Sequence, residues 1–304
     1  MIDLHCHMLP GIDDGASNLA VAVEMARLAA ENGVETQACT PHILPGLYHN
    51  SGPQIRAATE SLQKRLDEEG VPLRLVVGAD AHLAPDMPEK IRSGTIPTLA
   101  DSRYLLVEPP HHVAPPRLDD AFFRILVAGH VPILTHPERL DWIESHYPAI
   151  VRLFEAGVWM QVTAGSLLGA FGRRPLYWAE RMLSEGRVHI LATDAHGVGR
   201  RRPALAQGRD AAARRLGAEE ARRLVYDRPA AVIADHPPNR VPAPGFDSRG
   251  AYGSMTAARS REGRGRRSEG VVHGGETRSF RALERRNGGG ARSLLDRLRA
   301  LFSE

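Results

Sequence analysis

The chain has 304 residues, 42% of them hydrophobic, which is enough for one large α/β domain or two smaller ones. Its net charge of +3 is unevenly distributed, because the segment from Val241 to the end contains 13 Arg and 7 acidic residues. Residues 1–240 therefore carry about −3, which argues against nucleic-acid binding by this part. Two cysteines, an N-terminus without a signal pattern and the lack of a long apolar run predict a cytoplasmic protein with no disulfide framework and no transmembrane segment.

Strand-like runs and helical patterns alternate over the first three quarters of the chain. Strands are predicted at Ile2–Leu4, Thr36–Thr40, Leu73–Gly78, Tyr104–Glu108, Ile133–Thr135, Trp159–Val162 and Val188–Thr193. Helices are predicted at Leu19–Asn32, Gln54–Glu69, Arg117–Ala128, Pro148–Ala156, Leu176–Glu185, Ala204–Leu216 and Ala218–Tyr226. Ser17 or Asn18 is expected to cap the first helix, and Gly33 to end it. Repeated strand-then-helix units predict an α/β fold, a distorted (β/α)7 barrel with its chemistry at the carboxyl ends of the strands.

The C-terminal part of the chain has a different composition. Regular structure is interrupted by a series of prolines, Pro229, Pro237, Pro238, Pro242 and Pro244. We expect the barrel domain to cover residues 1–240, a disordered Gly/Ser/Arg-rich linker to cover residues 241–290, and a short amphipathic helix to cover residues 291–304. This last helix could contact a protein partner or an anionic membrane surface, and a solvated extension without function is the alternative.

Ionisable residues follow the predicted strands in a repeated pattern. They are His5, His7, Asp13, Asp14, His42, Asp80, Glu108, His136, Asp194 and His196. Because side chains alternate along a strand, His5 and His7 should point one way and Cys6 the other. Each residue alone is more simply read as part of an ordinary turn or core, but the carboxyl ends of barrel strands meet at one place. Together these residues predict a single cluster, with Thr163 as a small polar lining residue at the one strand end that lacks such a group.

The residue types in this cluster indicate a hydrolytic metal centre. The cluster consists of His, Asp and Glu without Cys. These side chains are more ligands than one ion takes, and their number suits two or three divalent ions. Nitrogen and oxygen ligands favour Mn, Fe or Zn without choosing among them. A carboxylate such as Glu108 can bridge ions, and the bridged ions lower the pKa of a shared water to give hydroxide near neutral pH.

Arginines close to the predicted cluster indicate an anionic substrate. Arg139 follows His136 by three residues, and the run Arg200–Arg202 follows His196. The guanidinium fork matches phosphate oxygens, although a solvated basic loop is the alternative for the run of three.

Two other hydrolase classes fit this chain less well. A cysteine phosphatase needs an Arg at a fixed spacing after its nucleophile, where Ile12 and Pro45 stand instead. A metal bridge made from a carbamylated lysine needs a strand-end Lys, whereas Lys64 and Lys90 lie in helical or loop contexts.

Six stretches of the sequence, in order, resemble the PHP (polymerase and histidinol phosphatase) superfamily. More narrowly, they resemble the bacterial metal-dependent tyrosine phosphatases of capsule and exopolysaccharide operons. The stretches are Met1–Gly15, Thr40–Asn50, Tyr104–Pro109, Ile133–Arg139, Gln161–Gly172 and Ala192–His196. The resemblance covers roughly residues 1–235 and leaves the tail without a counterpart.

This resemblance implies a PHP-type barrel that hydrolyses phosphotyrosine on the tyrosine autokinase of polysaccharide export. A metal-activated hydroxide would attack phosphorus in line, with no covalent enzyme intermediate. The centre would be trinuclear, commonly with manganese, and its implied ligands are His5, His7, Asp14, His42, Asp80, Glu108, His136, Asp194 and His196. Arg139, together with Arg201 or Arg202, would bind the phosphate, and His42 would act with them in catalysis.

One residue departs from the family pattern, and two other functions stay open. The third-strand ligand is usually Glu in the family, whereas Asp80 is one methylene shorter and His82 could compensate. The first alternative is a PHP phosphoesterase that acts on a small phosphate ester. The second is a metal-containing regulatory or scaffold protein without turnover.

Overall fold

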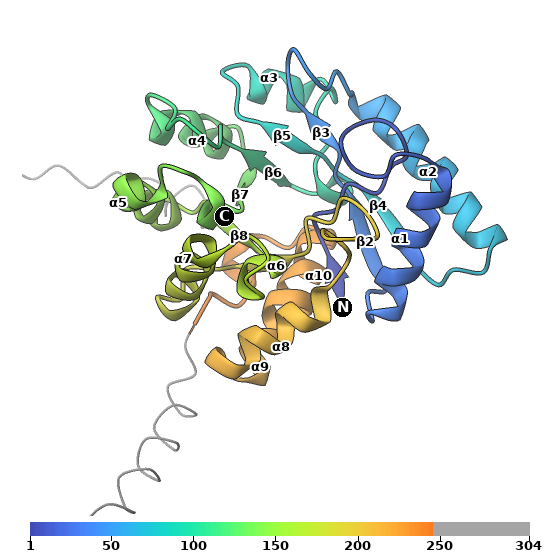
Figure 1. The fold of residues 1–304 in the computed structure, drawn as a ribbon. Helices are drawn as coiled ribbons and strands as arrows, with labels where there is room; N and C mark the ends of the chain where they lie inside the picture. Colours follow the sequence, from blue (N-terminus) through green and yellow to red (C-terminus); the bar gives the residue numbers. More distant parts are fainter. Residues whose placement is uncertain (246–304) are drawn as a thin grey trace, which may run out of the picture. The chain divides into compact units, whose positions relative to one another are not determined.

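The computed structural model describes residues 1–245 of the protein, in which short strands alternate with helices (Figure 1). The strands are β1 (Ile2–Asp3), β2 (Thr36–Cys39), β3 (His42–Ile43), β4 (Arg74–Val77), β5 (Asp80–His82), β6 (Tyr104–Glu108), β7 (Val131–Thr135), β8 (Trp159–Thr163) and β9 (Ile190–Ala192). The α-helices are α1 (Leu19–Glu31), α2 (Gly52–Glu68), α3 (Met87–Arg92), α4 (Leu118–Val127), α5 (Ile143–Glu155), α6 (Ala164–Leu167), α7 (Arg173–Ser184), α8 (Leu205–Leu216), α9 (Ala218–Arg222) and α10 (Arg228–Ile233). Short 3-10 turns lie at Leu99–Asp101, Pro137–Arg139 and Pro238–Arg240, and a π-helical turn, Arg223–Asp227, joins α9 to α10.

Every pair of named strands in the described residues is parallel, which confirms the predicted α/β class. One sheet has the order β1-β2-β4, and the other has the order β3-β5-β6-β7-β8-β9. β3 follows β2 after a break at residues 40–41, and β5 follows β4 after a break at residues 78–79, so these two chain segments contribute to both sheets. At the β1 and β9 edges, an isolated parallel bridge between Cys6 and Ala195 links the sheets. The count of seven barrel units stays a prediction.

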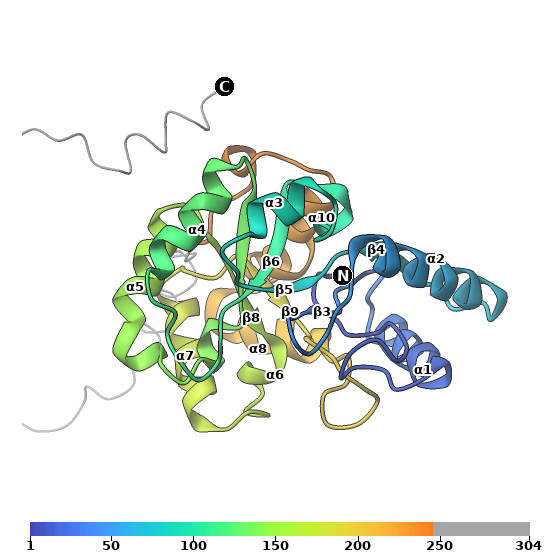
Figure 2. The same ribbon diagram turned by 90° about the horizontal axis from the view of Figure 1, so that it is seen from above.

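Helices lie around the outside of the strands, with α1 and α2 on one side and α4, α5 and α7 on the other in both views (Figures 1 and 2). Apolar side chains from the strands fill the interior, among them Leu4, Leu106, Ile133 and Ile190, which have no solvent exposure. Each such side chain contributes roughly 1.5–3 kcal/mol to folding. This core holds the strands together, so their carboxyl ends present polar groups at fixed positions.

The first helix begins at the predicted residue, Leu19, and ends at Glu31, one residue before the predicted end. The Asn18 side chain accepts a hydrogen bond from the Val21 N–H at 3.1 Å, which satisfies one free donor of the first turn. Gly33 follows the helix with φ 82°, a backbone conformation that glycine adopts without steric cost. Helix α1 thereby returns the chain directly to β2.

Several elements differ from the sequence predictions. The short elements β3, β5, α3 and α6 were not predicted, because two to six residues carry too little periodic pattern. Helix α5 begins at Ile143 rather than Pro148, and a kink at His146 accommodates the proline within the helix. Helical structure also continues past Tyr226 to Ile233, because Pro229 falls in the first turn of α10, where a missing N–H costs nothing.

The last described residues, 241–245, contact the barrel instead of leaving it. Val241 is buried, and the Arg228 guanidinium donates to the carbonyl oxygens of Pro242 and Ala243 at 2.8 and 2.9 Å. The body therefore extends at least five residues beyond the boundary predicted at residue 240. The rest of the predicted linker and the helix predicted at 291–304 lie outside the described residues. Among the helices that the structure describes, none combines the length and the apolar character needed to span a bilayer.

Candidate active site

The chain beyond β1 is held beside the end of β9. The His7 N–H donates to the Ala195 carbonyl at 2.9 Å, and the Asp194 N–H donates to the His5 carbonyl at 2.8 Å. This pairing sends the two imidazoles to one side, with their Nε2 atoms 3.2 Å apart, and the Cys6 thiol toward the Ala195 carbonyl on the other. The predicted alternation of His5, Cys6 and His7 is confirmed.

The side chains predicted from the strand ends lie in one continuous cluster. Each belongs to at least one group of three or more His, Asp or Glu side chains whose nitrogen or oxygen atoms lie within 4.8 Å of one another. They are His5, His7, Asp14, His42, Asp80, Glu108, His136, Asp194 and His196. The structure therefore brings together every residue that the sequence proposed as a ligand.

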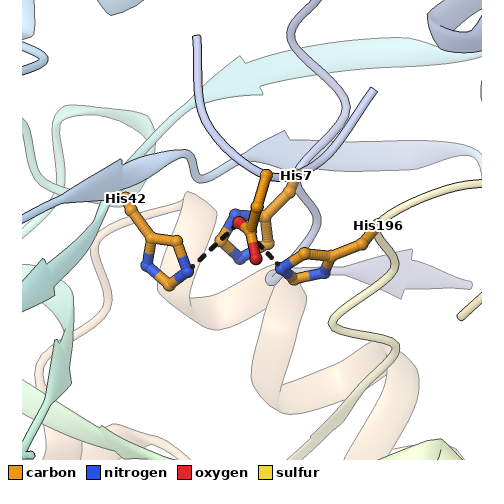
Figure 3. Close-up of side chains that lie close together, drawn as sticks. His7, His42 and His196 are labelled. Carbon is orange, nitrogen blue, oxygen red and sulfur yellow. Dashed lines mark ion pairs between the residues drawn. The ribbon is translucent and has the colours of Figure 1, made fainter. Parts of the chain in front are cut away.

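The imidazoles of His7, His42 and His196 lie close together (Figure 3), and Asp14 contacts two of them. Its Oδ1 atom is 3.5 Å from His42 Nε2 and 3.4 Å from His196 Nε2. The rings of His7 and His196 are 3.8 Å apart between centroids. These N···O separations exceed ordinary hydrogen-bond lengths and suit ligands that surround one ion.

Strand register brings a second part of the cluster together. His42 on β3 is paired with Asp80 on β5, and His82 on β5 is paired with Glu108 on β6. His42 Nδ1 is 3.5 Å from Asp80 Oδ2 and 3.4 Å from Glu108 Oε2, while His5 Nε2 is 3.4 Å from Asp80 Oδ2. Asp80 is fully buried, and neither of its oxygens accepts a hydrogen bond. Burial of a carboxylate in this condition is costly, and a cation among these groups would offset its charge.

Asp194 connects the imidazoles to two arginines through its two oxygens. Its Oδ1 atom is 3.4 Å from the Nε2 atoms of both His5 and His7. Its Oδ2 atom accepts from the guanidinium of Arg139 and, at 2.7 Å, from that of Arg201. One carboxylate thus faces the predicted ligands on one side and the predicted phosphate-binding residues on the other.

Two residues of the cluster have strained backbone conformations. His136 has φ 32° and Asp194 has φ 51°, both in the left-handed region that residues other than glycine rarely adopt. Such a conformation costs on the order of 1–3 kcal/mol per residue and is concentrated at functional sites. The fold maintains this strain at two strand ends, where it turns both side chains into the cluster.

Neighbouring polar groups orient the imidazoles. Gln161 Oε1 is 2.8 Å from His5 Nδ1, and Asp13 Oδ2 is 2.7 Å from His7 Nδ1. Both contacts leave the Nε2 atoms facing the cluster, as in metal sites where a carboxylate or amide fixes the ring. Gly15 permits this loop to pack, because a Cβ at that position would lie 2.0 Å from the His7 carbonyl oxygen. The sequence placed Asp13 in the predicted cluster but not among the implied ligands, and Gln161 carried no signal of its own.

The charged and hydrogen-bonding neighbours of Asp194 keep this acid ionised. Although burial opposes ionisation, the positive charge of His5, a hydrogen bond from His7 and the two arginines hold the pKa of Asp194 well below its usual value. Burial likewise disfavours a charged His7, but hydrogen bonds to Asp13 and Asp194 raise the pKa of that imidazole to about 10. Burial and Arg139 hold the pKa of His136 well below its usual value. Ionised carboxylates and a neutral imidazole are the forms that bind metal ions, and binding at His7 would release its proton.

The three consecutive arginines after His196 have different environments. Arg201 contacts the Asp194 side chain, whereas Arg202 is exposed and has no hydrogen bond or ion pair to the cluster within residues 1–245. Arg200 donates to the Ala170 carbonyl at 3.4 Å. All three border a cavity of about 160 Å³ that Phe171 also lines, and the guanidinium of Arg139 lies 4.4 Å above the Phe171 ring. Of the two candidates left open by the sequence, the geometry favours Arg201.

A buried glutamate that the sequence did not indicate supports the end of β8. Glu138 has no solvent exposure, and its Oε1 atom accepts from the Thr163 N–H at 2.9 Å and from the Ser166 hydroxyl at 2.8 Å. Burial raises the pKa of this carboxyl, against the lowering effect of both donors. Glu138 thereby fixes the direct junction between β8 and α6 at Thr163.

The fold and the site together define a class: an α/β protein with parallel strands whose carboxyl ends carry a His, Asp and Glu cluster of metal-binding type. Residues 1–234 match the family described as "Capsular polysaccharide synthesis, CpsB/CapC", and the chain belongs to this family. The resemblance inferred from the six sequence stretches is therefore confirmed.

Individual relatives agree with this membership. The tyrosine-protein phosphatase YwqE of Bacillus subtilis (strain 168) is 35% identical over 198 residues, which cover 65% of this chain and 78% of that protein. The tyrosine-protein phosphatase CpsB of Streptococcus pneumoniae is 30% identical over 246 residues, which cover 77% of this chain and 99% of that protein. One crystal structure from work on these two proteins, described there as unique metal-dependent tyrosine phosphatases, superposes with a TM-score of 0.74 and 31% identity, covering 77% of this chain and 95% of that chain.

Proposed function

We propose that the protein is a metal-dependent protein-tyrosine phosphatase that hydrolyses phosphotyrosine in proteins. The observation that carries this proposal is the position of Asp194, whose two oxygens face the imidazole cluster and the guanidinium groups of Arg139 and Arg201. A metal centre and an anion-binding pair that share one carboxylate suit a phosphate ester better than a neutral substrate. The similarity to named tyrosine phosphatases supports the same substrate class.

The residues present fit a centre of two or three divalent ions. Asp80 is the clearest sign, because its carboxylate is fully buried without a hydrogen-bond donor and lies 3.4 and 3.5 Å from two imidazole nitrogens. Cations among these groups would offset the buried negative charge. The nitrogen and oxygen donors suit Mn, Fe or Zn alike, and the family resemblance is the reason to propose Mn. When bound, such ions lower the pKa of a coordinated water and offset charge on phosphoryl oxygens.

The protein side chains would bind and orient the ester. Arg139 and Arg201 present guanidinium groups beside the cluster, where they can donate to two oxygens of a phosphoryl group. Burial lowers the pKa of His42, so this imidazole is available in its neutral form next to Asp14 and Asp80. The phenol of tyrosine has a pKa of about 10, so its phenolate is a better leaving group than an alkoxide. Hydrolysis of phosphotyrosine therefore depends less on a strong general acid than hydrolysis of an alkyl phosphate does.

The proposed partner is a tyrosine-phosphorylated protein, and specifically the tyrosine kinase of a polysaccharide-export system. Membership of a capsular polysaccharide synthesis family supports this assignment. We place the reaction in the cytoplasm, which agrees with Cys6 and Cys39 both being free thiols in the protein interior.

Metal analysis combined with a substrate comparison tests the proposal. Full-length protein purified without added metal is analysed for bound elements and assayed with a phosphotyrosyl peptide and an alkyl phosphate, in the presence of Mn, Zn, Fe or Mg. We expect bound divalent ions, faster hydrolysis of the peptide, and loss of turnover in His136→Ala with the fold retained. Faster alkyl phosphate hydrolysis would indicate a small-ester phosphatase, and bound metal without turnover on either substrate would indicate a scaffold.

A further inference from the structure

A histidine outside the predicted set lies against Glu108. His111 is in the loop that follows β6, and its Nε2 atom is 3.0 Å from Glu108 Oε1. The same carboxylate oxygen is 3.5 Å from His136 Nε2, and the two imidazole rings are 4.9 Å apart between centroids. Three donor atoms from three side chains therefore face one small space at the rim of the cluster.

The separations suit a single ion. The donor atoms of Glu108, His111 and His136 all lie within 4.8 Å of one another. Histidine nitrogens and carboxylate oxygens lie about 2.0–2.2 Å from a bound divalent ion such as Zn²⁺. Two donor atoms of one ion are therefore roughly 3–4 Å apart. Asp80 belongs to groups with His5 and His7 and with His42 and Glu108, but within residues 1–245 it shares no such group with His136. Without His111, the space beside Glu108 Oε1 would have only two protein ligands.

The loop that carries His111 is fixed by hydrogen bonds to its backbone. The His111 carbonyl accepts from the Asp141 N–H at 2.9 Å, and the Pro110 carbonyl accepts from Trp142 Nε1 at 2.9 Å. Its neighbour His112 instead points away, with a side chain that is 87% exposed and paired with Asp141. The chain thus places one of two adjacent imidazoles in the cluster and the other in solvent.

We propose that His111 is a metal ligand, and that Glu108, His111 and His136 together hold one divalent ion of the centre. The inference rests on the proposed metal centre and adds a ligand that neither the strand-end pattern nor the family resemblance supplies. Glu108 is central to it, because His82 contacts its Oε2 atom at 2.7 Å and leaves Oε1 to His111 and His136. The alternative is that His111 only orients Glu108 through a hydrogen bond.

The first test compares metal retention in two neighbouring variants. Full-length wild type, His111→Ala and His112→Ala are loaded with Mn²⁺ or Zn²⁺ and titrated with a chelator, and bound metal is measured by elemental analysis. We expect His111→Ala to hold one ion more than about 100-fold more weakly, beyond the roughly 10–100-fold effect of a group that only orients a ligand. His112→Ala should match wild type. Equal retention in all three proteins would overturn the inference.

The second test detects the bond between residue 111 and the ion directly. His111→Cys and His112→Cys are each loaded with Co²⁺, and absorption is compared with that of loaded wild type, which corrects for the thiols of Cys6 and Cys39. Ligation predicts a thiolate-to-cobalt charge-transfer band in His111→Cys alone, which a purely structural role would not produce. Absence of the band in a folded, cobalt-loaded variant would contradict ligation. A wild type that binds no metal would instead refute the proposed centre as a whole.

Discussion

Strand β9 has an arginine contact at each of its ends, and the two contacts differ in what surrounds them. At the amino end, Arg228 donates to the His189 carbonyl at 3.4 Å and to Glu220 Oε1 at 2.7 Å. At the carboxyl end, Arg139 and Arg201 both contact Asp194. Both carboxylates are almost fully buried, so in each place a buried negative charge depends on guanidinium groups.

Every guanidinium nitrogen donates at one end of β9, whereas nitrogens remain without a hydrogen bond at the other. Arg228 has no solvent exposure, and its Nε and Nη2 atoms also donate to the carbonyls of Pro242 and Ala243. The side chains of Arg139 and Arg201 are 15% and 30% exposed, and their hydrogen bonds within residues 1–245 come from Nη1 of Arg139 and Nη2 of Arg201. A partly exposed guanidinium with unused donors can bind an oxyanion, whereas a buried one with every nitrogen engaged holds structure. We therefore propose that the same type of interaction serves stability at the amino end of β9 and substrate binding at the carboxyl end, the division of roles that is usual in barrels.

Of the substitutions at the carboxyl end of β9, Asp194→Asn should have the largest effect on catalysis. The substitution keeps the size of the side chain but removes the charge that faces His5, His7 and both arginines. We expect kcat/KM for an aryl phosphate to fall by at least about 1000-fold, because metal binding and arginine placement both depend on that charge. Steady-state kinetics with circular dichroism as the fold control would measure it, and near-normal turnover would refute the assigned role of Asp194.

Arg228→Met should have the opposite profile. Removing the guanidinium leaves the buried Glu220 with Arg223, 3.4 Å from its Oε2 atom, as its remaining cation, so the cost should approach the roughly 3–5 kcal/mol of a broken buried ion pair. Urea unfolding would show this loss, while kcat/KM below the unfolding range should remain near wild type. Adding Glu220→Leu should recover part of the stability, because the poorly compensated buried charge is then gone. A large kinetic defect in the folded single variant would mean that the amino end also serves catalysis.

The sequence alone predicts one end of β9 much better than the other. The strand-end ligands could be predicted for two reasons. Side chains alternate along a strand, and the carboxyl ends of parallel strands meet at one place. Together these rules set the direction of His5, His7, Asp194 and His196. Arg228 gave no such signal, because its partners include carbonyl groups 14 and 15 residues away that only the folded chain brings near. Long-range backbone contacts of this kind leave no trace in periodicity.

Loops limited the prediction of the site itself. His111 lies after a strand end rather than at it, and only the hydrogen bonds of its loop turn it toward Glu108. In the same way, the sequence could not choose between Arg201 and Arg202, since adjacent loop residues follow no fixed alternation. Side-chain direction is predictable in regular strands and depends on tertiary contacts in loops.

Arg139→Ala should weaken substrate binding with little loss of stability. Its guanidinium contacts Asp194 and stacks on Phe171, but it remains partly exposed, so the acid retains Arg201 as a partner. We expect KM for an aryl phosphate to rise roughly 10- to 100-fold, the effect of one lost charged contact, with metal content unchanged. Elemental analysis beside the kinetics distinguishes this outcome from a structural role, in which the metal would be lost as well.

The smallest expected difference separates two adjacent arginines. Arg201→Ala should raise KM in the same direction as Arg139→Ala, because both guanidinium groups contact the same Asp194 oxygen. Arg202→Ala should stay within about twofold of wild type, since exposed side chains without such contacts rarely change free energies by more than about 0.5 kcal/mol. Kinetics on the two single variants with one aryl phosphate would decide between them. If Arg202→Ala had the larger effect, the phosphate would bind in the cavity that the three arginines border rather than beside Asp194, and the partly exposed guanidinium of Arg201 would not mark the binding site.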